Sequence, residues 1–231
     1  ELVMGVHDGH RERLRNRFIE HGLDSFNELN ALELLLFYAI PRKDTNEIAH
    51  ALLDKFGSLY GVLDAGVHEL EEVKGLGRSG AVLISLVTQI MRKSLISQQE
   101  SKPVITNAKQ AGEFLVPRFM YEKEELFLIL CLDSNKKLIS CTEVSRGVVN
   151  SVEANVRRVA ELALKHRASS VIMAHNHPDG LARPSREDDY VTKQIYSALN
   201  VLGIPLVDHI VVSDKTYVSY SDTGLLELYR Y

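Results

Sequence analysis

The sequence of 231 residues contains no apolar run of the roughly 18 to 20 residues that a transmembrane helix needs. Its opening segment, ELVMGVHDGHRERLRNRF, also lacks the apolar stretch of a secretory signal peptide. Only two cysteines are present, Cys131 and Cys141, which is too few for a disulfide framework, and both have apolar neighbours. We therefore expect a cytoplasmic protein with reduced, buried thiols and no membrane partner.

Neither sign of charge dominates, because 27 Lys and Arg residues are balanced by 31 Asp and Glu residues for a formal net charge of −4. Such a chain has no global attraction to nucleic acid, so any binding of that kind requires a local basic patch. Internal repeats and low-complexity tracts are absent from the sequence. The composition, 45% hydrophobic and 25% charged, is that of a globular protein, and the length suits one large or two modest domains.

The N-terminal part of the chain has helical periodicity throughout, with glycines at the expected helix ends. Within it, Asn30 and Glu33 have the spacing of a capping pair. The segment ISQQESKPVITNAKQ that follows is polar, contains a proline and has no clear period. We therefore expect a helical domain over 1–98, a linker over 99–108 and a second domain over 109–231.

The pattern changes in the C-terminal part of the chain. The stretch EELFLILCLDSNKKLISCTEVSRG predicts two strands joined by a turn. An amphipathic helix, a buried strand ending in HNHP, another helix and the strands IPLVDHIVVSD and TYVSYS follow. This order predicts an α/β or α+β domain in which helices pack against one sheet.

Two histidines, His175 and His177, end the predicted strand SSVIMAHNHP. Side chains at i and i+2 of a strand point the same way, so the two imidazoles share a face. Asp188 lies at the start of the next helix and comes within reach if that helix folds back over the strand end. Two imidazoles and one carboxylate form the ligand set of a catalytic zinc whose fourth position is left for water.

An alternative interpretation of this segment needs no metal. Ser185 and Asp188 have the spacing of an N-cap and its acidic N3 residue, and histidines near a turn are commonly solvated. On spacing alone both interpretations stand, and they are compatible, because a capped first turn would hold Asp188 rigidly. The Asp208-His209 pair on a later strand either supports the site or belongs to the core, and we favour the core.

The motif His175-Asn-His177-Pro, followed by Ser185-Arg-Glu-Asp188, resembles the H-x-H-P…S-x-x-D motif of the JAMM (JAB/MPN) metalloproteases. The form AHNHPDG…PSREDD, with IPLVDHIVV and YVSYSDTG, is similar to the bacterial RadC family over nearly the whole chain. This resemblance implies a JAB/MPN-like domain, with a mixed sheet flanked by helices, after a helical domain. It also implies a zinc ion held by His175, His177 and Asp188, and a Ser185 hydroxyl that donates to the oxyanion of a tetrahedral intermediate.

The resemblance further implies a glutamate on an upstream strand that acts as general base. Glu125, which opens the predicted strand ELFLILCLD, matches the position where RadC-like sequences carry one, and Glu143 at the end of the partner strand is the alternative. Two residues depart from the pattern: Asn176 replaces the Ser or Thr usual in JAMM proteases, and Asp179 replaces a serine of RadC-like chains. The carboxylate of Asp179 could bind a second cation or repel an acidic substrate.

The segment EVKGLGRSGAVLI has the form of a helix-hairpin-helix element, with Gly75 and Gly77 allowing a tight turn. Amides before the second helix could contact a phosphate, and Lys74 and Arg78 would add positive charge. The same segment also fits a plain connector, since it lacks interleaved aromatics and follows an acidic stretch. DNA binding through Lys74, Gly75, Gly77 and Arg78 is therefore one of two interpretations of this turn.

The leading hypothesis is an enzyme, a zinc-dependent hydrolase of JAMM type in which metal-activated water attacks a peptide or isopeptide carbonyl of a protein substrate. The RadC resemblance also carries an association with DNA repair. The alternatives are a DNA-binding protein with a structural or idle metal site and a metal-dependent nuclease. A zinc deaminase is disfavoured because no P-C-x-x-C follows the histidines, and a two-histidine, one-carboxylate iron oxygenase stays formally open. The sequence predicts neither the identity of the substrate nor the oligomeric state.

Overall fold

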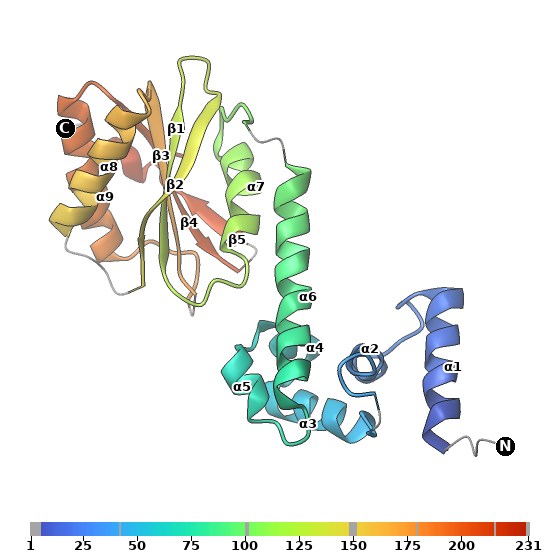
Figure 1. Cartoon of the computed structure of the whole chain (residues 1–231). Coiled ribbons are helices and arrows are strands. Elements are labelled where there is room, and N and C mark those ends of the chain that lie inside the picture. The colour runs from blue at the N-terminus through green and yellow to red at the C-terminus, as the bar shows by residue number, and fades with distance from the viewer. Residues whose placement is uncertain are drawn as a thin grey trace. The chain divides into compact units, whose positions relative to one another are not determined.

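The computed structural model describes residues 6–41, 43–99, 102–147, 152–178, 180–214 and 216–229. The chain divides into two compact units, Glu1–Met91 and Arg92–Tyr231, here called the helical unit and the sheet unit (Figure 1). The division lies inside one long helix, Gly77–Gln98, which continues without interruption across it. The sequence analysis instead placed the boundary in a linker after this helix.

The helical unit packs around a cluster of buried aliphatic side chains that includes Leu36, Leu52, Leu70 and Ile84. Each of these four residues lies in a different helix, so the helices of this unit pack their apolar sides against one another. The helices are α1 Val6–His21, α2 Glu28–Leu36, α3 Asn46–Phe56, α4 Leu59–Asp64, α5 Val67–Glu71 and α6 Gly77–Gln98, the last of which enters the sheet unit.

Helix α2 begins earlier than the expected Asn30–Glu33 capping pair would place it. Asn27 is extended and is the N-cap, and its side-chain oxygen accepts from the Asn30 amide at 2.8 Å. Glu33 is instead buried within the helix, with its carboxylate 2.9 Å from a ring nitrogen of His10. The capping prediction was therefore wrong, because the N-cap is Asn27, three residues before Asn30, and its side chain satisfies the Asn30 amide.

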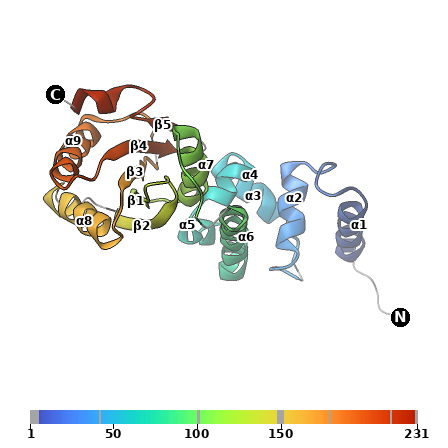
Figure 2. The ribbon, with the colours of Figure 1, turned by 90° about the horizontal axis from the view of Figure 1, so that it is seen from above.

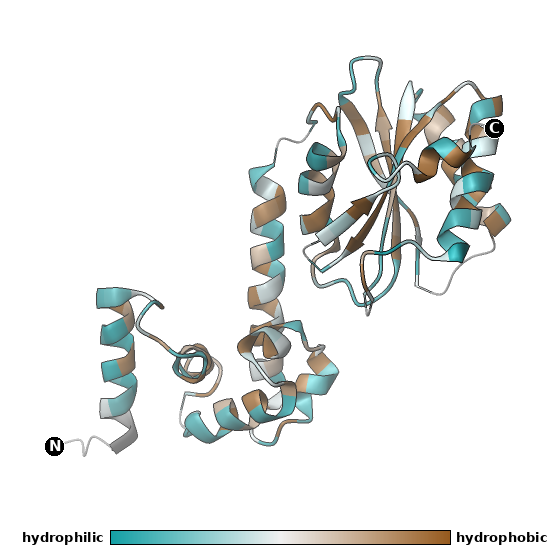
Figure 3. Cartoon of the chain, turned by 180° about the vertical axis from the view of Figure 1, so that it is seen from behind, coloured by the Kyte–Doolittle hydropathy of each residue, from teal (hydrophilic) through white to brown (hydrophobic). Residues whose placement is uncertain are grey.

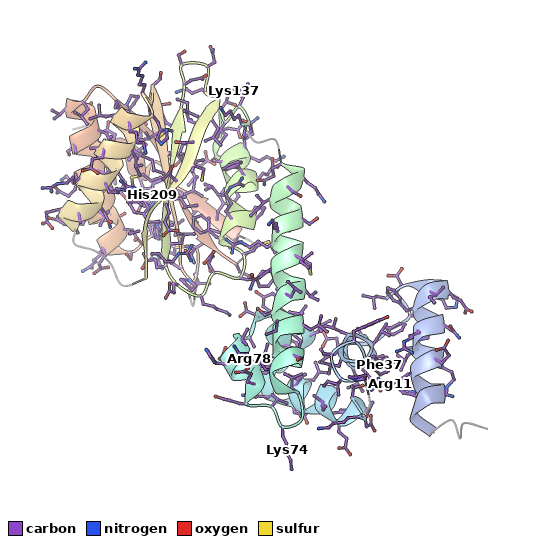
Figure 4. All side chains as sticks on the ribbon, viewed as in Figure 1. Arg11, Phe37, Lys74, Arg78, Lys137 and His209 are labelled. Atoms are coloured by element: carbon purple, nitrogen blue, oxygen red, sulfur yellow. The ribbon has the colours of Figure 1, made fainter. Side chains whose placement is uncertain are left out.

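Arg11 of α1 is buried in the same unit and lies over the ring of Phe37, with 4.6 Å between the guanidinium carbon and the ring centre (Figure 4). Its guanidinium donates to the Ile40 and Pro41 carbonyl oxygens at 2.7 and 2.9 Å. Arg11 is thus used inside the fold, because a buried guanidinium requires acceptors and finds them beyond the end of α2.

One described helix, α6, is long and apolar enough to cross a membrane by length and composition alone. The sequence analysis did not anticipate this, because polar residues interrupt its apolar character. Ala81 and Ile84 of α6 are fully buried in the core of the helical unit. Only 22% of its most apolar window is buried, and a single helix of this length and composition is weak evidence for a membrane segment.

The sheet unit contains one five-stranded sheet in the order β2-β1-β3-β4-β5, in which β3 and β4 are parallel and the other pairs are antiparallel. Helices α8 and α9 cover one face of the sheet and α7 covers the other (Figures 1 and 2). The expected mixed sheet flanked by helices is confirmed. The elements are α7 Ala108–Phe119, β1 Leu126–Leu132, β2 Leu138–Arg146, α8 Val152–Lys165, β3 Ser170–Asn176, α9 Arg186–Val201, β4 Leu206–Ser213, β5 Thr216–Ser219 and the 3-10 turn Leu225–Tyr229.

Strand parity assigns each side chain to one face of the sheet. Ile129 of β1 and Met173 of β3 belong to the core beneath α8 and α9, whereas Leu128 and Ala174 belong to the core beneath α7. Both cores bury apolar side chains, so β1 and β3 are buried along their whole length and are mostly hydrophobic (Figure 3). By the same alternation His175 lies on the face that α8 and α9 cover.

Helix α7 was not predicted, because Gly112 and Pro117 lower the helix propensity of its sequence. The ring of Tyr217 occupies the place where a β-carbon at Gly112 would lie. Ile105, in the expected linker, is buried in the core beneath α7 and its amide donates to the Lys136 carbonyl at 2.9 Å. The end of that segment therefore belongs to the sheet unit.

Candidate metal centre

Three side chains converge where β3 ends and α9 begins. His175 lies in β3, His177 follows its last residue, and Asp188 lies in the first turn of α9. The Nε2 atoms of the two histidines are 3.0 Å apart. Oδ1 of Asp188 lies 3.1 Å from Nε2 of His175, and Oδ2 lies 3.3 Å from Nε2 of His177. The predicted ligand set is thus assembled with its nitrogen and oxygen atoms in mutual contact.

The start of α9 holds Asp188 in place through a capping box. Ser185 is the N-cap, and its hydroxyl accepts from the Asp188 amide at 3.0 Å while its own amide donates to Oδ2 of Asp188 at 2.7 Å. The capping interpretation and the metal interpretation of this segment therefore describe one structure. The cap fixes the carboxylate in the orientation that brings it to the histidines.

Hydrogen bonding shows which nitrogen of His177 faces the cluster as an acceptor. Its Nδ1 lies 3.0 Å from the carbonyl oxygen of Leu181, which can only accept, so Nδ1 carries the proton. In the neutral ring Nε2 is then a bare lone pair directed at Asp188 and His175. A group of acceptors at this spacing repels itself unless a proton or a metal ion lies among them.

The spacing of the cluster suits a small tetrahedral metal ion. Ligands about 2.0–2.1 Å from a tetrahedral centre are separated from one another by about 3.3 Å. The two imidazole nitrogens are 3.0 Å apart, and they lie 3.1 and 3.3 Å from different oxygens of the Asp188 carboxylate, which is close to that edge length. One ligand atom from each of His175, His177 and Asp188 lies within 4.8 Å of the other two. The residues present therefore fit a zinc-sized ion.

The electrostatics of Asp188 favour its carboxylate form. Burial by itself raises the pKa of this carboxyl, but the hydrogen bond and charge of His175 and the bonds from Ser185 outweigh it. The net effect lowers the pKa well below its usual range. Asp188 is therefore an anion at neutral pH, as metal ligation requires.

A cavity of about 680 Å³ opens onto the cluster. His175, His177, Ser185 and Asp188 all line it, together with Glu125, which precedes the first residue of β1. Part of the cavity lining is apolar and is formed by Phe127, Val152 and Val191. The predicted ligands, oxyanion donor and base therefore surround one space, open to a substrate.

The alternative base, Glu143, lies elsewhere. It is on β2, is half-exposed and pairs with Arg146 at 3.1 Å. It lines a different cavity with Cys141 and Arg118. Of the two candidate glutamates, only Glu125 lines the cavity of the His175–His177–Asp188 cluster, here called the metal-type cluster.

Asn176 connects the ligand strand to the chain around Glu125. Its side-chain oxygen accepts from the Leu126 amide at 2.7 Å, and its side-chain nitrogen donates to the Glu124 carbonyl at 3.2 Å. These two peptide groups flank Glu125. The asparagine that departs from the JAMM pattern therefore extends the β1–β3 pairing by one step and holds both neighbours of Glu125 in place. Asp179, the other departure, lies outside the described residues.

His209 of β4, for which the sequence analysis favoured a role in the core, lies against the predicted metal ligand His175. It is buried, and its Nε2 lies 2.8 Å from Nδ1 of His175. Burial first, and then the charge of His175, lowers the pKa of His209 well below its ordinary value. The alternation along IPLVDHIVV was visible in the sequence. The residue of β3 that each residue of this strand pairs with was not.

The glycine turn of the helical unit joins α5 to α6. Gly75 and Gly77 have φ angles of +92° and +66°, so both use the left-handed region that favours glycine. Lys74 projects from the turn (Figure 4), and Arg78 is 88% exposed, 4.0 Å from Glu71. The structure places these four predicted residues together on one turn, and DNA contact through them stays a prediction.

Comparisons with known proteins identify a family to which this chain is similar. The model of the RadC-like JAB domain matches residues 105–225. A UPF0758 protein of Fusobacterium nucleatum is 34% identical over 94% of this chain and 97% of its own length. UPF0758 proteins of Methylibium petroleiphilum and Pseudoalteromonas atlantica are 34% and 32% identical, each over 93% of this chain and 96% of its own length.

Proposed function

Because this chain belongs to the RadC-like JAB domain family, we propose that it is a zinc-dependent hydrolase that cleaves peptide or isopeptide bonds. The observation that carries the proposal is the convergence of His175, His177 and Asp188, each of which offers one ligand atom within 4.8 Å of those of the other two. Bound zinc would supply a Lewis acid that lowers the pKa of a water molecule and polarises a carbonyl.

Two side chains of the protein supply the other catalytic groups, a general base and an oxyanion donor. Glu125 takes a proton from the attacking water and passes it to the leaving nitrogen as the carbon–nitrogen bond breaks and a carbon–oxygen bond forms. Ser185 donates its hydroxyl to the developing oxyanion. The lone pair with which Ser185 accepts from the Asp188 amide is separate from its own proton, so capping and donation are compatible.

The choice of zinc follows from the donor atoms. Two imidazole nitrogens and one carboxylate oxygen are the ligands of many catalytic zinc sites, in which a fourth position remains open. Magnesium and calcium prefer sites made of oxygen alone. The iron oxygenase alternative shares the ligand set, and metal analysis of the purified protein would distinguish it from a zinc site.

DNA binding by the helical unit is the second proposed activity. The exposed Arg78 and the outward Lys74 flank a turn whose glycines allow close approach of a phosphate to the backbone. Such contact would dock the protein on DNA without reading sequence, and a role in DNA repair would depend on it.

Metal analysis of the purified chain tests the proposed site. We expect about one zinc per wild-type chain and loss of zinc from His175→Ala and Asp188→Ala, because each variant removes a ligand. Inductively coupled plasma mass spectrometry gives the metal content, and circular dichroism establishes that the variants are folded. Thr142→Ala, which changes a half-buried residue of β2, serves as the control and should keep its zinc.

The result that would overturn the metal site is equal zinc content in wild type and both ligand variants, or no metal in any of them after reconstitution. Iron in place of zinc would support the site and overturn the choice of metal. A panel of peptides and ubiquitin-like isopeptides then tests the reaction, with the zinc-free protein as the reference.

A further inference from the structure

A continuous chain of hydrogen bonds runs from His175 back to Asp188 through the interior of the sheet unit. Nδ1 of His175 lies 2.8 Å from Nε2 of His209, and Nδ1 of His209 lies 2.7 Å from the hydroxyl of Thr192. That hydroxyl lies 2.5 Å from the carbonyl oxygen of Asp188. Two of the predicted metal ligands are therefore joined by His209 and Thr192 through neutral groups.

The direction of this chain is determined at its far end. The Asp188 carbonyl can only accept, so the single proton of the Thr192 hydroxyl is used there. Nδ1 of His209 must then donate to the threonine oxygen, which leaves Nε2 of a neutral His209 as an acceptor. Nδ1 of His175 consequently carries a proton and donates to it. The remaining nitrogen of His175, Nε2, is the one that faces His177 and Asp188.

The surroundings support a neutral chain. Thr192 and His209 are 0% and 2% exposed, so water does not compete for these bonds. Both nitrogens of His209 face a hydrogen-bonding partner, His175 on one side and Thr192 on the other, and a neutral ring donates from one nitrogen and accepts at the other. The ring of Tyr220 stacks on His209 with 4.8 Å between centres and 22° between planes, and holds the imidazole in one orientation. Figure 4 places His209 among the packed side chains of the sheet unit.

We propose that His209 and Thr192 are positioning residues that set the tautomer of His175 and present its Nε2 lone pair to a metal ion. This inference rests on the proposed function, because it concerns the same site. Metal-ligating histidines usually donate their other nitrogen to a carboxylate, a carbonyl or water. Here a second histidine accepts that proton, and the chain closes on the backbone of another ligand, so the ring orientation of His175 and the first turn of α9 are coupled.

Two threonine variants separate the hydroxyl from the shape of the side chain. Thr192→Val keeps the branched shape but leaves Nδ1 of His209 without an acceptor, so its tautomer is no longer determined. Thr192→Ser keeps the hydroxyl. Loss of such a supporting bond typically weakens metal binding by about 10–100-fold. We expect that loss for Thr192→Val in zinc competition against a chromophoric chelator, and an affinity within about threefold of wild type for Thr192→Ser.

His209→Phe offers a second route if the valine variant does not fold. The phenyl ring retains the stacking on Tyr220 but accepts no hydrogen bond, so zinc affinity should fall by about the same factor. Equal zinc affinity in wild type, folded Thr192→Val and folded His209→Phe would overturn the proposal. Thermal unfolding of each variant, measured without metal, separates a change of affinity from a loss of fold.

Nuclear magnetic resonance of the wild-type protein tests the chain without relying on zinc. Long-range proton–nitrogen correlations distinguish a protonated from a bare ring nitrogen. We expect His209 to carry its proton on Nδ1 both before and after zinc is added, and to show a mixture of tautomers in Thr192→Val. A proton on Nε2 of His209 in the wild type would overturn the proposed direction of the hydrogen-bond chain. Absence of zinc binding by the wild type would instead overturn the proposed function, so the two failures are distinct.

Discussion

Glu125 and Glu143 show how much the surroundings of one carboxylate matter. Glu125 precedes the first residue of β1 and lines the cavity of the His175–His177–Asp188 cluster. Glu143 lies within β2, not at its end as the sequence analysis expected, and pairs with Arg146 on another surface. Glu125→Gln should lower kcat by about 10²–10⁴-fold while zinc content stays at the wild-type level, since the variant removes the base and no ligand. Hydrolysis of a peptide or isopeptide substrate and metal analysis on the same samples provide the measurement.

The matched control for that experiment is Glu143→Gln, which makes the same chemical change outside the cavity and should leave kcat unchanged. Full activity of Glu125→Gln would show that the proton is taken by another group. Loss of activity in Glu143→Gln alone would move the base to β2.

The two cysteines take no part in this chemistry. Burial raises the pKa of the Cys131 thiol, and burial raises the pKa of the Cys141 thiol to about 11. Both are free thiols, and Cys131 is fully buried in the core beneath α8 and α9, as the sequence analysis expected of a small hydrophobic residue. A thiol that stays protonated at neutral pH is a poor nucleophile, which agrees with a water-based mechanism.

Among the elements, α7 depends most on one close contact. The ring of Tyr217 on β5 packs against Gly112, where a β-carbon would overlap it. Gly112→Ala raises helix propensity but should lower the free energy of unfolding by about 1–3 kcal/mol, because the helix or the ring must shift. Urea denaturation followed by circular dichroism measures the difference.

A double variant identifies the cause of that destabilisation. Tyr217→Leu removes the ring, so Gly112→Ala should cost less free energy in the Tyr217→Leu background than in wild type, and the two effects should not add. Additive effects would show that the overlap with Tyr217 is not what makes Gly112 necessary.

For the whole molecule, we expect DNA binding by the helical unit and metal binding by the sheet unit to be separable by mutation. The double variant Lys74→Ala/Arg78→Ala should weaken DNA binding and reduce the dependence of log K on log salt by about 0.9 for each phosphate that is no longer neutralised. Its zinc content should equal that of wild type, since the metal-type cluster lies in the sheet unit. Fluorescence anisotropy with a labelled duplex over a series of salt concentrations measures the affinity and its salt dependence.

Two further variants complete that test. His177→Ala should lose zinc and retain DNA binding, and Lys109→Ala, which removes an exposed lysine of the sheet unit, should change neither. DNA affinity unchanged in Lys74→Ala/Arg78→Ala would leave the glycine turn as a connector that uses its glycines for backbone geometry alone.

Much of the fold was predictable because local periodicity is strong in this chain. The hairpin of β1 and β2, strand β3 and the capped start of α9 all follow from apolar runs, turn residues or spacing within a few residues. Helix α7 was missed for the opposite reason. Its glycine and proline oppose a helix locally, and only packing against the sheet and Tyr217 compensates.

The sequence by itself determined the ligand candidates, because an i, i+2 pair on a strand and an N3 position on a capped helix are local relations that bring His175, His177 and Asp188 to one edge. Only the tertiary structure decided what supports them. An irregularity in the β3–β4 pairing after Val171 skips one residue, so that His209 pairs with Met173 and shares the face of His175. Without that skip His209 would pair with Ala174 and lie on the opposite face. Strand register depends on how two segments of the chain pair with each other, so it cannot be read from the sequence of either segment alone.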